Sequence, residues 1–158
     1  MREVLDSKDV EILRIIQEDC RAAAREISNR TNTPATTVFA KIKRMERLGI
    51  VKGYRAILDS SKLDVGTTAF VLGSFAYRGE GGKVLSQREV AKQIAEFPEV
   101  QEVHIISGDW DILMKVKDRD VGSIGRFVVD KLRLVKGIEK TLTCLVFESE
   151  KETTAIPL

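Results

Sequence analysis

Basic side chains are concentrated in one short stretch towards the end of the first third of the chain. Residues 41–55 contain six lysines and arginines and one acidic residue, Glu46. Residues 1–60 carry 12 basic and 9 acidic side chains, a net charge of +3, whereas residues 61–158 carry 14 and 15, a net charge of −1. Such a local excess of positive charge favours a polyanionic partner, and a solvated helix face is the alternative.

The basic residues fall on one face of a predicted helix at 34–48. Thr33 is expected to cap this helix, Pro34 suits its first position, and Gly49 is expected to end it. At about 100° per residue, one side is apolar and comprises Ala35, Val38, Ile42 and Met45. The other side is polar and comprises Thr36, Thr37, Ala40, Lys43, Arg44 and Arg47, with Lys41 at its border.

Two shorter helices are predicted before it. Asp6 and Asp9 form a capping-box pattern ahead of an apolar stripe, and a second helix is expected at about 22–30, with Ala23 and Ile27 facing the core. About four turn residues separate the second and third helices, as in a helix-turn-helix. The third helix would then enter a DNA major groove. Thr36, Thr37 and Ala40 are expected at base edges, and Lys41, Lys43, Arg44 and Arg47 at phosphates or guanine.

The remaining residues predict a βαββαβ pattern after a connecting strand at 52–58. Strands are expected at 67–78, 100–107, 110–117 and 138–149, with helices after Ser86 and after Asp118 or Asp120. This order is typical of a ferredoxin-like domain. We therefore expect an α+β protein with a winged-type helix-turn-helix domain at 1–60, a ferredoxin-like domain at 61–150 and a tail at 151–158.

The predicted strands carry apolar residues on both faces, although the two helices can cover only one. A bare apolar sheet face predicts association, most simply a twofold dimer, which also suits a reader of two DNA half-sites.

Several kinds of site are not expected. Cys20, Cys144 and the single His104 lack metal-ligand spacing, so both cysteines are expected to be buried, reduced thiols and no metal is expected. Nucleotide-binding and hydrolase motifs are absent, so neither a catalytic residue nor a cofactor is expected. No apolar run is long enough to cross a bilayer, and we expect a cytoplasmic protein.

Three stretches of this sequence resemble the Lrp/AsnC, or feast/famine, family of regulators. The first is Leu5-Asp6-Ser7-Lys8-Asp9-Val10-Glu11-Ile12-Leu13. The second is Val38, Ile42 and Met45-Glu46-Arg47-Leu48-Gly49-Ile50-Val51, with Gly53-Tyr54-Arg55-Ala56. The third is Ser107-Gly108-Asp109-Trp110-Asp111. The resemblance covers about residues 4–150. It implies an amino-acid-sensing second domain, dimers that often assemble into octamers, and an effector site between dimers.

By the same resemblance, that site involves the turn at 108–111. Gly108, Asp109 and Asp111 match the family pattern, Trp110 stands where the family usually has Tyr or Phe, and Thr141 and Thr143 lie where it often has hydroxyl residues. A carboxylate can pair with the ammonium of an amino acid, while N–H groups of the turn hold its carboxylate. The alternative is a tight turn with solvated acids.

Two other functions share these features. Siroheme decarboxylases resemble the same two-domain family, but they need imidazole groups in the second domain, and this chain has only His104. An architectural DNA-binding protein would share residues 1–58 and bind no amino acid. We expect a transcriptional regulator rather than an enzyme.

Overall fold

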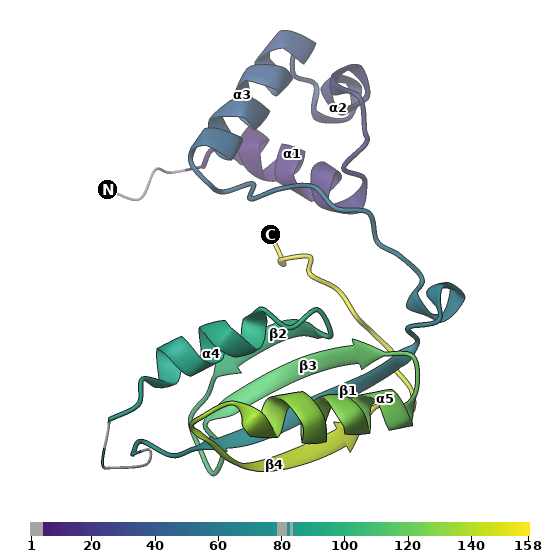
Figure 1. Cartoon of the computed structure of the whole chain (residues 1–158). Helices are drawn as coiled ribbons and strands as arrows, with labels where there is room; N and C mark the ends of the chain where they lie inside the picture. The colour runs from purple at the N-terminus through teal and green to yellow at the C-terminus, as the bar shows by residue number, and fades with distance from the viewer. Residues whose placement is uncertain (1–4, 79–81, 83) are drawn as a thin grey trace. The chain divides into compact units, whose positions relative to one another are not determined.

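The computed structural model describes residues 5–78, 82 and 84–158 (Figure 1). The chain divides into two compact units. One runs up to Ile57 and also takes in Glu152–Leu158, and the other is Leu58–Lys151. The N-terminal part and the last residues of the chain therefore belong to the same unit.

The first unit contains three helices, α1 (Ser7–Glu18), α2 (Ala24–Thr31) and α3 (Ala35–Arg47). The predicted capping box of α1 is confirmed, because Asp9 N donates to Asp6 Oδ1 at 2.8 Å and Asp6 N donates to Asp9 Oδ2 at 2.9 Å. The core that joins the helices comprises Ile12, Leu13, Ile15, Ile27, Val38 and Met45.

The ends of α2 and α3 differ in part from the prediction. Ala23 is exposed at the N-cap of α2 rather than in the core. Thr33 does not cap α3; its hydroxyl donates to the carbonyl of Thr31 at 3.2 Å, and Pro34 is the N-cap. Gly49 ends α3 as predicted, with a φ of 69°, because the amides at 49 and 50 turn back onto the last carbonyls of the helix.

The second unit is an antiparallel sheet with two helices. Its elements are β1 (Thr67–Phe75), α4 (Gln87–Ala95), β2 (Val100–Ile105), β3 (Ile112–Asp118), α5 (Val121–Arg126) and β4 (Ile138–Leu145). A 3-10 turn (Ser60–Leu63) precedes β1. The strand order is β2-β3-β1-β4, and α4 and α5 cover one face of the sheet (Figure 1). The predicted ferredoxin-like arrangement and the α+β class are confirmed.

Alternation along the strands separates a covered face from an open one. Val71 of β1 and Met114 of β3 are opposite each other, fully buried, in the core beneath the helices. Phe70 and Leu142 lie on the other face and are 38% and 45% exposed. Because α5 continues through a π turn (Phe127–Lys131) and a 3-10 turn (Leu132–Leu134), Phe127 joins the core although the sequence analysis did not single it out.

Two further expectations are wrong. Residues 52–58 form no strand within the chain, and Ile57 and Leu58 are 99% and 68% exposed. Cys20 and Cys144 are both exposed free thiols rather than buried ones. Cys144 is exposed because it lies on the open face of β4, opposite Phe70.

No helix among the described residues is long and apolar enough to span a membrane.

Candidate nucleic-acid and effector sites

A narrow exposed stripe runs along α3. Thr36, Ala40, Lys43 and Arg47 are exposed and follow one another by four, three and four residues, so they lie on one face of the helix. Thr37 is exposed beside the stripe. The stripe combines a hydroxyl, a methyl group and two cations, which are the groups that read base edges and bind phosphates in a major groove.

The two cations of the stripe have different surroundings. Lys43 Nζ lies 2.7 Å from Glu46 Oε2 and 5.8 Å from the centre of the Phe39 ring. Tyr54 donates to the other oxygen of Glu46 at 3.0 Å, and these two bonds, that of Lys43 first, lower the pKa of Glu46 below its usual value. Arg47 is exposed and has no polar partner among the described residues.

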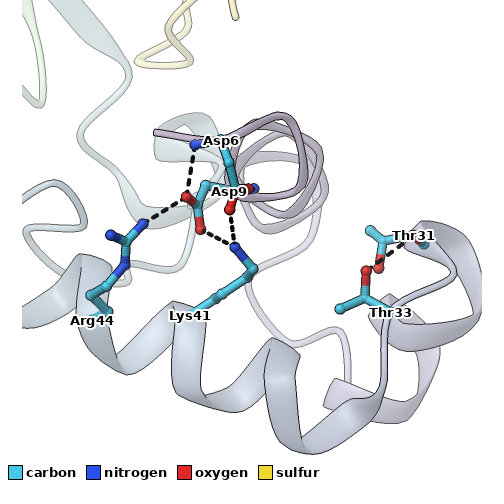
Figure 2. Close-up of polar contacts among 6 residues, drawn as sticks. All are labelled: Asp6, Asp9, Thr31, Thr33, Lys41 and Arg44. Carbon is cyan, nitrogen blue, oxygen red and sulfur yellow. Dashed lines mark hydrogen bonds and ion pairs between the residues drawn. The ribbon is translucent and has the colours of Figure 1, made fainter. Parts of the chain in front are cut away.

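Lys41 and Arg44, which the sequence also assigned to the DNA-binding face, are held against α1. Figure 2 shows the Asp9 carboxylate between them, with Arg44 Nη2 at 2.6 Å and Lys41 Nζ at 3.1 Å. Lys41 also lies 2.5 Å from Asp6 Oδ2. The side chain of Asp9 is fully buried, so α3 is fixed to the start of α1 by a buried carboxylate with two cationic partners.

This cluster also shifts proton affinities. The bond from Lys41, followed by the bond from the Asp9 amide, lowers the pKa of Asp6. The bond to Asp6 raises the pKa of Lys41, although burial opposes it. Lys41 and Arg44 therefore hold α3 against α1, and their contact with DNA stays a prediction.

Phe39 is a residue that the sequence analysis missed. It is 58% exposed and lies on α3 beside the stripe, close to Lys43. At about 100° per residue, Phe39 lies next to Lys43 around the helix, at the edge of the polar side, and this position could have identified it. An exposed aromatic ring at this position can contact thymine methyl groups or sugars.

The turn at 108–111 is built into the second unit by Asp111. The carboxylate of Asp111 accepts a hydrogen bond from Phe75 N at 2.8 Å. The main-chain N–H of Asp111 donates to the Gly73 carbonyl at 3.1 Å. Its carbonyl accepts bonds from Ile106 N and from Gln87 of α4. Asp111 thus holds the turn to β1 where the β1–β4 register shifts, and its carboxylate is already in use.

A shallow pocket of about 480 Å³ lies beside this turn. It is lined by Trp110, Arg133, Glu139, Lys140, Thr141 and Leu142. Arg133 Nε lies 3.4 Å from Thr141 Oγ1. The pocket brings together an aromatic wall, cations, a hydroxyl and a carboxylate, which are complementary to an amino acid zwitterion.

Only part of the predicted effector set meets in this pocket. Trp110 and Thr141 line it, whereas Gly108, Asp109 and Thr143 are exposed outside its lining. Gly108 has a φ of 119°, which explains the glycine in the turn. Arg133 and Glu139 were not predicted, because nothing in their local sequence separates them from solvated charges.

His104 lies outside this pocket. It is exposed on β2, 3.3 Å from Glu102 on the same strand. Within the described part of the chain, no group of three or more His, Cys, Asp or Glu side chains has the arrangement of a metal site. The pocket therefore offers no imidazole for proton transfer.

Both units match families of known proteins. Residues 5–52 match the family model described as winged helix-turn-helix DNA-binding, and residues 80–156 match the Lrp/AsnC ligand binding domain. An uncharacterised HTH-type transcriptional regulator of Pyrococcus abyssi is 40% identical over 152 residues, covering 96% of this chain and 99% of the relative. The HTH-type transcriptional regulator FL11 of Pyrococcus horikoshii is 33% identical over 158 residues, covering 100% and 99%.

Solved structures agree over nearly the whole length. A transcriptional regulator of Neisseria meningitidis, in complex with L-methionine, is 27% identical with a TM-score of 0.88, covering 98% of this chain and 97% of that one. An AsnC family regulator of Agrobacterium tumefaciens is 28% identical with a TM-score of 0.87, covering 97% of each. The chain belongs to the Lrp/AsnC family of helix-turn-helix transcriptional regulators, with a DNA-binding unit and a ligand-binding unit.

Proposed function

We propose that this regulator binds specific DNA sequences as a homodimer through the stripe on α3. We also propose that a small-molecule effector, an amino acid, changes its assembly or its affinity for DNA. The observation that carries the proposal is the exposed line of Thr36, Ala40, Lys43 and Arg47 on a helix that buried Asp9 fixes in place. A rigid helix with short polar groups near its start and cations towards its end suits major-groove reading.

Selection of binding sequences from random duplexes tests the DNA part. We expect the full chain to enrich a pseudo-palindrome, since a twofold dimer presents the helix twice. Lys43→Ala and Arg47→Ala should weaken binding, whereas Lys92→Ala should not, because Lys92 is exposed on α4 in the other unit. Absence of binding to any duplex at low salt would overturn the proposal.

For the effector, the pocket beside Trp110 suggests how an amino acid is recognised. Arg133 and the Thr141 hydroxyl would receive its carboxylate, and Glu139 its ammonium. Trp110 and Leu142 would face its side chain, so an apolar amino acid fits this lining. Asp109 remains available as a second partner for the ammonium.

Calorimetry with each of the twenty amino acids tests the effector part. One or a few apolar amino acids should give heat, and Arg133→Ala should lower their affinity by roughly tenfold or more, through loss of a charge-assisted bond. Lys92→Ala should leave it unchanged. If no amino acid binds, the effector part fails, and an architectural protein that binds DNA without an effector is favoured.

A further inference from the structure

The last residues described return to the helix-turn-helix unit. Segment 152–158 belongs to the same compact unit as α1, although residues 58–151 form the other one. Three hydrogen bonds join the segment to α1. Gln17 Oε1 accepts from Ile156 N at 2.7 Å, Gln17 Nε2 donates to Ile156 O at 3.2 Å, and Arg14 Nε donates to Leu158 O at 2.8 Å.

The geometry of these bonds is that of a peptide-binding surface. The carboxamide of Gln17 pairs with the N–H and the carbonyl of one residue, as a neighbouring strand would. Arg14 and Gln17 are three residues apart and exposed, on the side of α1 away from buried Ile12 and Ile15. All three bonds use main-chain atoms of the segment, so they fix its path along α1.

We propose that the Arg14–Gln17 face of α1 is a docking surface for the chain's own segment 152–158, and that the docked segment straps the DNA-binding unit to the ligand-binding unit. The chain passes between the units at 57–58 and again at 151–152. With the segment released, only the first connection remains. With it docked, the two connections together restrict how the units can reorient.

The contacts are few and exposed, so docking is reversible. Docking buries no side chain of the segment in the core, and Ile156 and Leu158 remain 66% and 44% exposed. Docking therefore depends on the tether, which keeps the segment at a high local concentration near α1. A change in the path of the chain after β4 would alter this tether, which gives the ligand-binding unit a route to the DNA-binding unit.

Hydrogen exchange at the Ile156 amide tests docking directly, without DNA. Gln17→Ala removes both bonds to Ile156 and introduces a good helix former at an exposed position, so α1 should stay folded. We expect the Ile156 amide to exchange roughly five- to thirtyfold faster in Gln17→Ala than in wild type. Gln17→Glu, which keeps the acceptor for Ile156 N and loses the donor, should give an intermediate rate.

Thr154→Ala is the matched control, because Thr154 is exposed and makes no hydrogen bond to α1 among the described residues. In this variant the Ile156 amide should exchange at the same rate as in wild type. An Ile156 amide that exchanges as fast in wild type as in Gln17→Ala would overturn docking.

A second measurement tests the strap and rests on the proposed DNA binding. Wild type should prefer one spacing between DNA half-sites, and Gln17→Ala should bind several spacings with similar affinity. Identical spacing profiles would overturn the strap even if docking is observed. Failure of wild type to bind DNA contradicts the proposed function instead, and the exchange experiment then still decides docking.

Discussion

At the scale of single residues, the two cations of the α3 stripe differ in what already surrounds them. Lys43 is bonded to Glu46, whose other oxygen accepts from Tyr54. A phosphate must therefore compete with Glu46 for Lys43, whereas Arg47 has no such competitor among the described residues. The guanidinium of Arg47 can also bind guanine or phosphate through two parallel bonds.

We therefore expect Arg47→Ala to have the larger effect on DNA binding. If Arg47 contacts one phosphate, its loss lowers the slope of log affinity against log salt by about 0.9. If it reads guanine, about 1–3 kcal/mol of discrimination at one base pair is lost instead. Affinity measured at several salt concentrations, with Lys92→Ala as the control, checks this. An unchanged slope together with unchanged sequence preference would remove Arg47 from the interface.

Asp111 gives a prediction about stability rather than binding. Asp111→Ala leaves the amide of buried Phe75 without its side-chain acceptor, which should lower the free energy of unfolding of the second unit by about 1–3 kcal/mol. Asp111→Asn keeps an acceptor oxygen and should lose less. Urea unfolding followed by Trp110 fluorescence measures both. Equal stability of wild type and Asp111→Ala would show that this bond contributes nothing.

At the scale of elements, the contact between α1 and α3 depends on one buried carboxylate. Asp9 accepts bonds from Lys41, Arg44 and the Asp6 amide and is fully buried. Asp9→Asn removes the charge that balances Lys41 and Arg44, and we expect a loss of about 3 kcal/mol in the unfolding free energy of the first unit.

Asp6→Asn should lose less, because the Asp6 side chain is 58% exposed and Asn also caps helices well. Thermal unfolding of both variants checks this order. A larger loss in Asp6→Asn would contradict the role given to Asp9.

The lowered pKa of Asp6 makes the same contact sensitive to acid. A carboxylate whose pKa is lower in the folded state contributes its full stabilisation when the pH is above its usual pKa of 3.8. This contribution disappears as the pH falls through the lower pKa of the folded state. The first unit should therefore lose stability below about pH 4, and Asp6→Asn should flatten that dependence. Unfolding midpoints measured from about pH 6 to about pH 2 test this, and parallel curves for variant and wild type would contradict it.

Elements whose signals are local could be predicted from the sequence. The capping box of α1 and the glycine that ends α3 involve residues within a few positions of each other, and both are confirmed. Thr33 was predicted to cap α3, but its hydroxyl bonds to the end of α2 instead. A connecting strand was predicted at 52–58, but apolar residues alone do not make a strand without a neighbouring strand to pair with.

Among the candidate sites, too, groups formed within one helix could be predicted from the sequence, whereas groups formed by tertiary contacts could not. The stripe on α3 follows from helical period alone, so it could be predicted. The pairing of Lys41 and Arg44 with Asp9, and the pocket that joins Trp110 to Arg133 and Thr141, depend on tertiary packing across more than twenty residues of sequence. Charged residues of this kind look like solvated ones until the fold brings their partners to them.

At the scale of the whole molecule, the open face of the sheet carries the proposed dimer. Phe70 lies at its centre on β1, opposite Cys144 on β4 and Lys115 on β3. Lys115 is buried to 8% exposure and lies 3.7 Å from Glu102 of β2. Phe70 and Leu142 give this face exposed apolar side chains, and the cores of protein interfaces are richer in apolar residues than the rest of a protein surface.

Phe70→Glu places a negative charge at this centre and tests the dimer. The variant should fold, because the new carboxylate faces solvent in the protomer and lies opposite Lys115. In a dimer it would be buried, and we expect a loss of about 3 kcal/mol or more, roughly a hundredfold in dimer affinity. Sedimentation velocity over a range of concentrations measures this, and circular dichroism checks the fold.

Val121→Glu is the matched control for this experiment. It adds the same charge to an apolar residue that is 57% exposed, at the start of α5 and away from the open sheet face, where an acidic residue favours the helix. Its association should equal that of wild type. A Phe70→Glu protein that stays dimeric would mean that the copies meet elsewhere. Two copies of α3 would then be presented to DNA through a different symmetry axis, and the preferred half-site spacing would have to be explained from that axis.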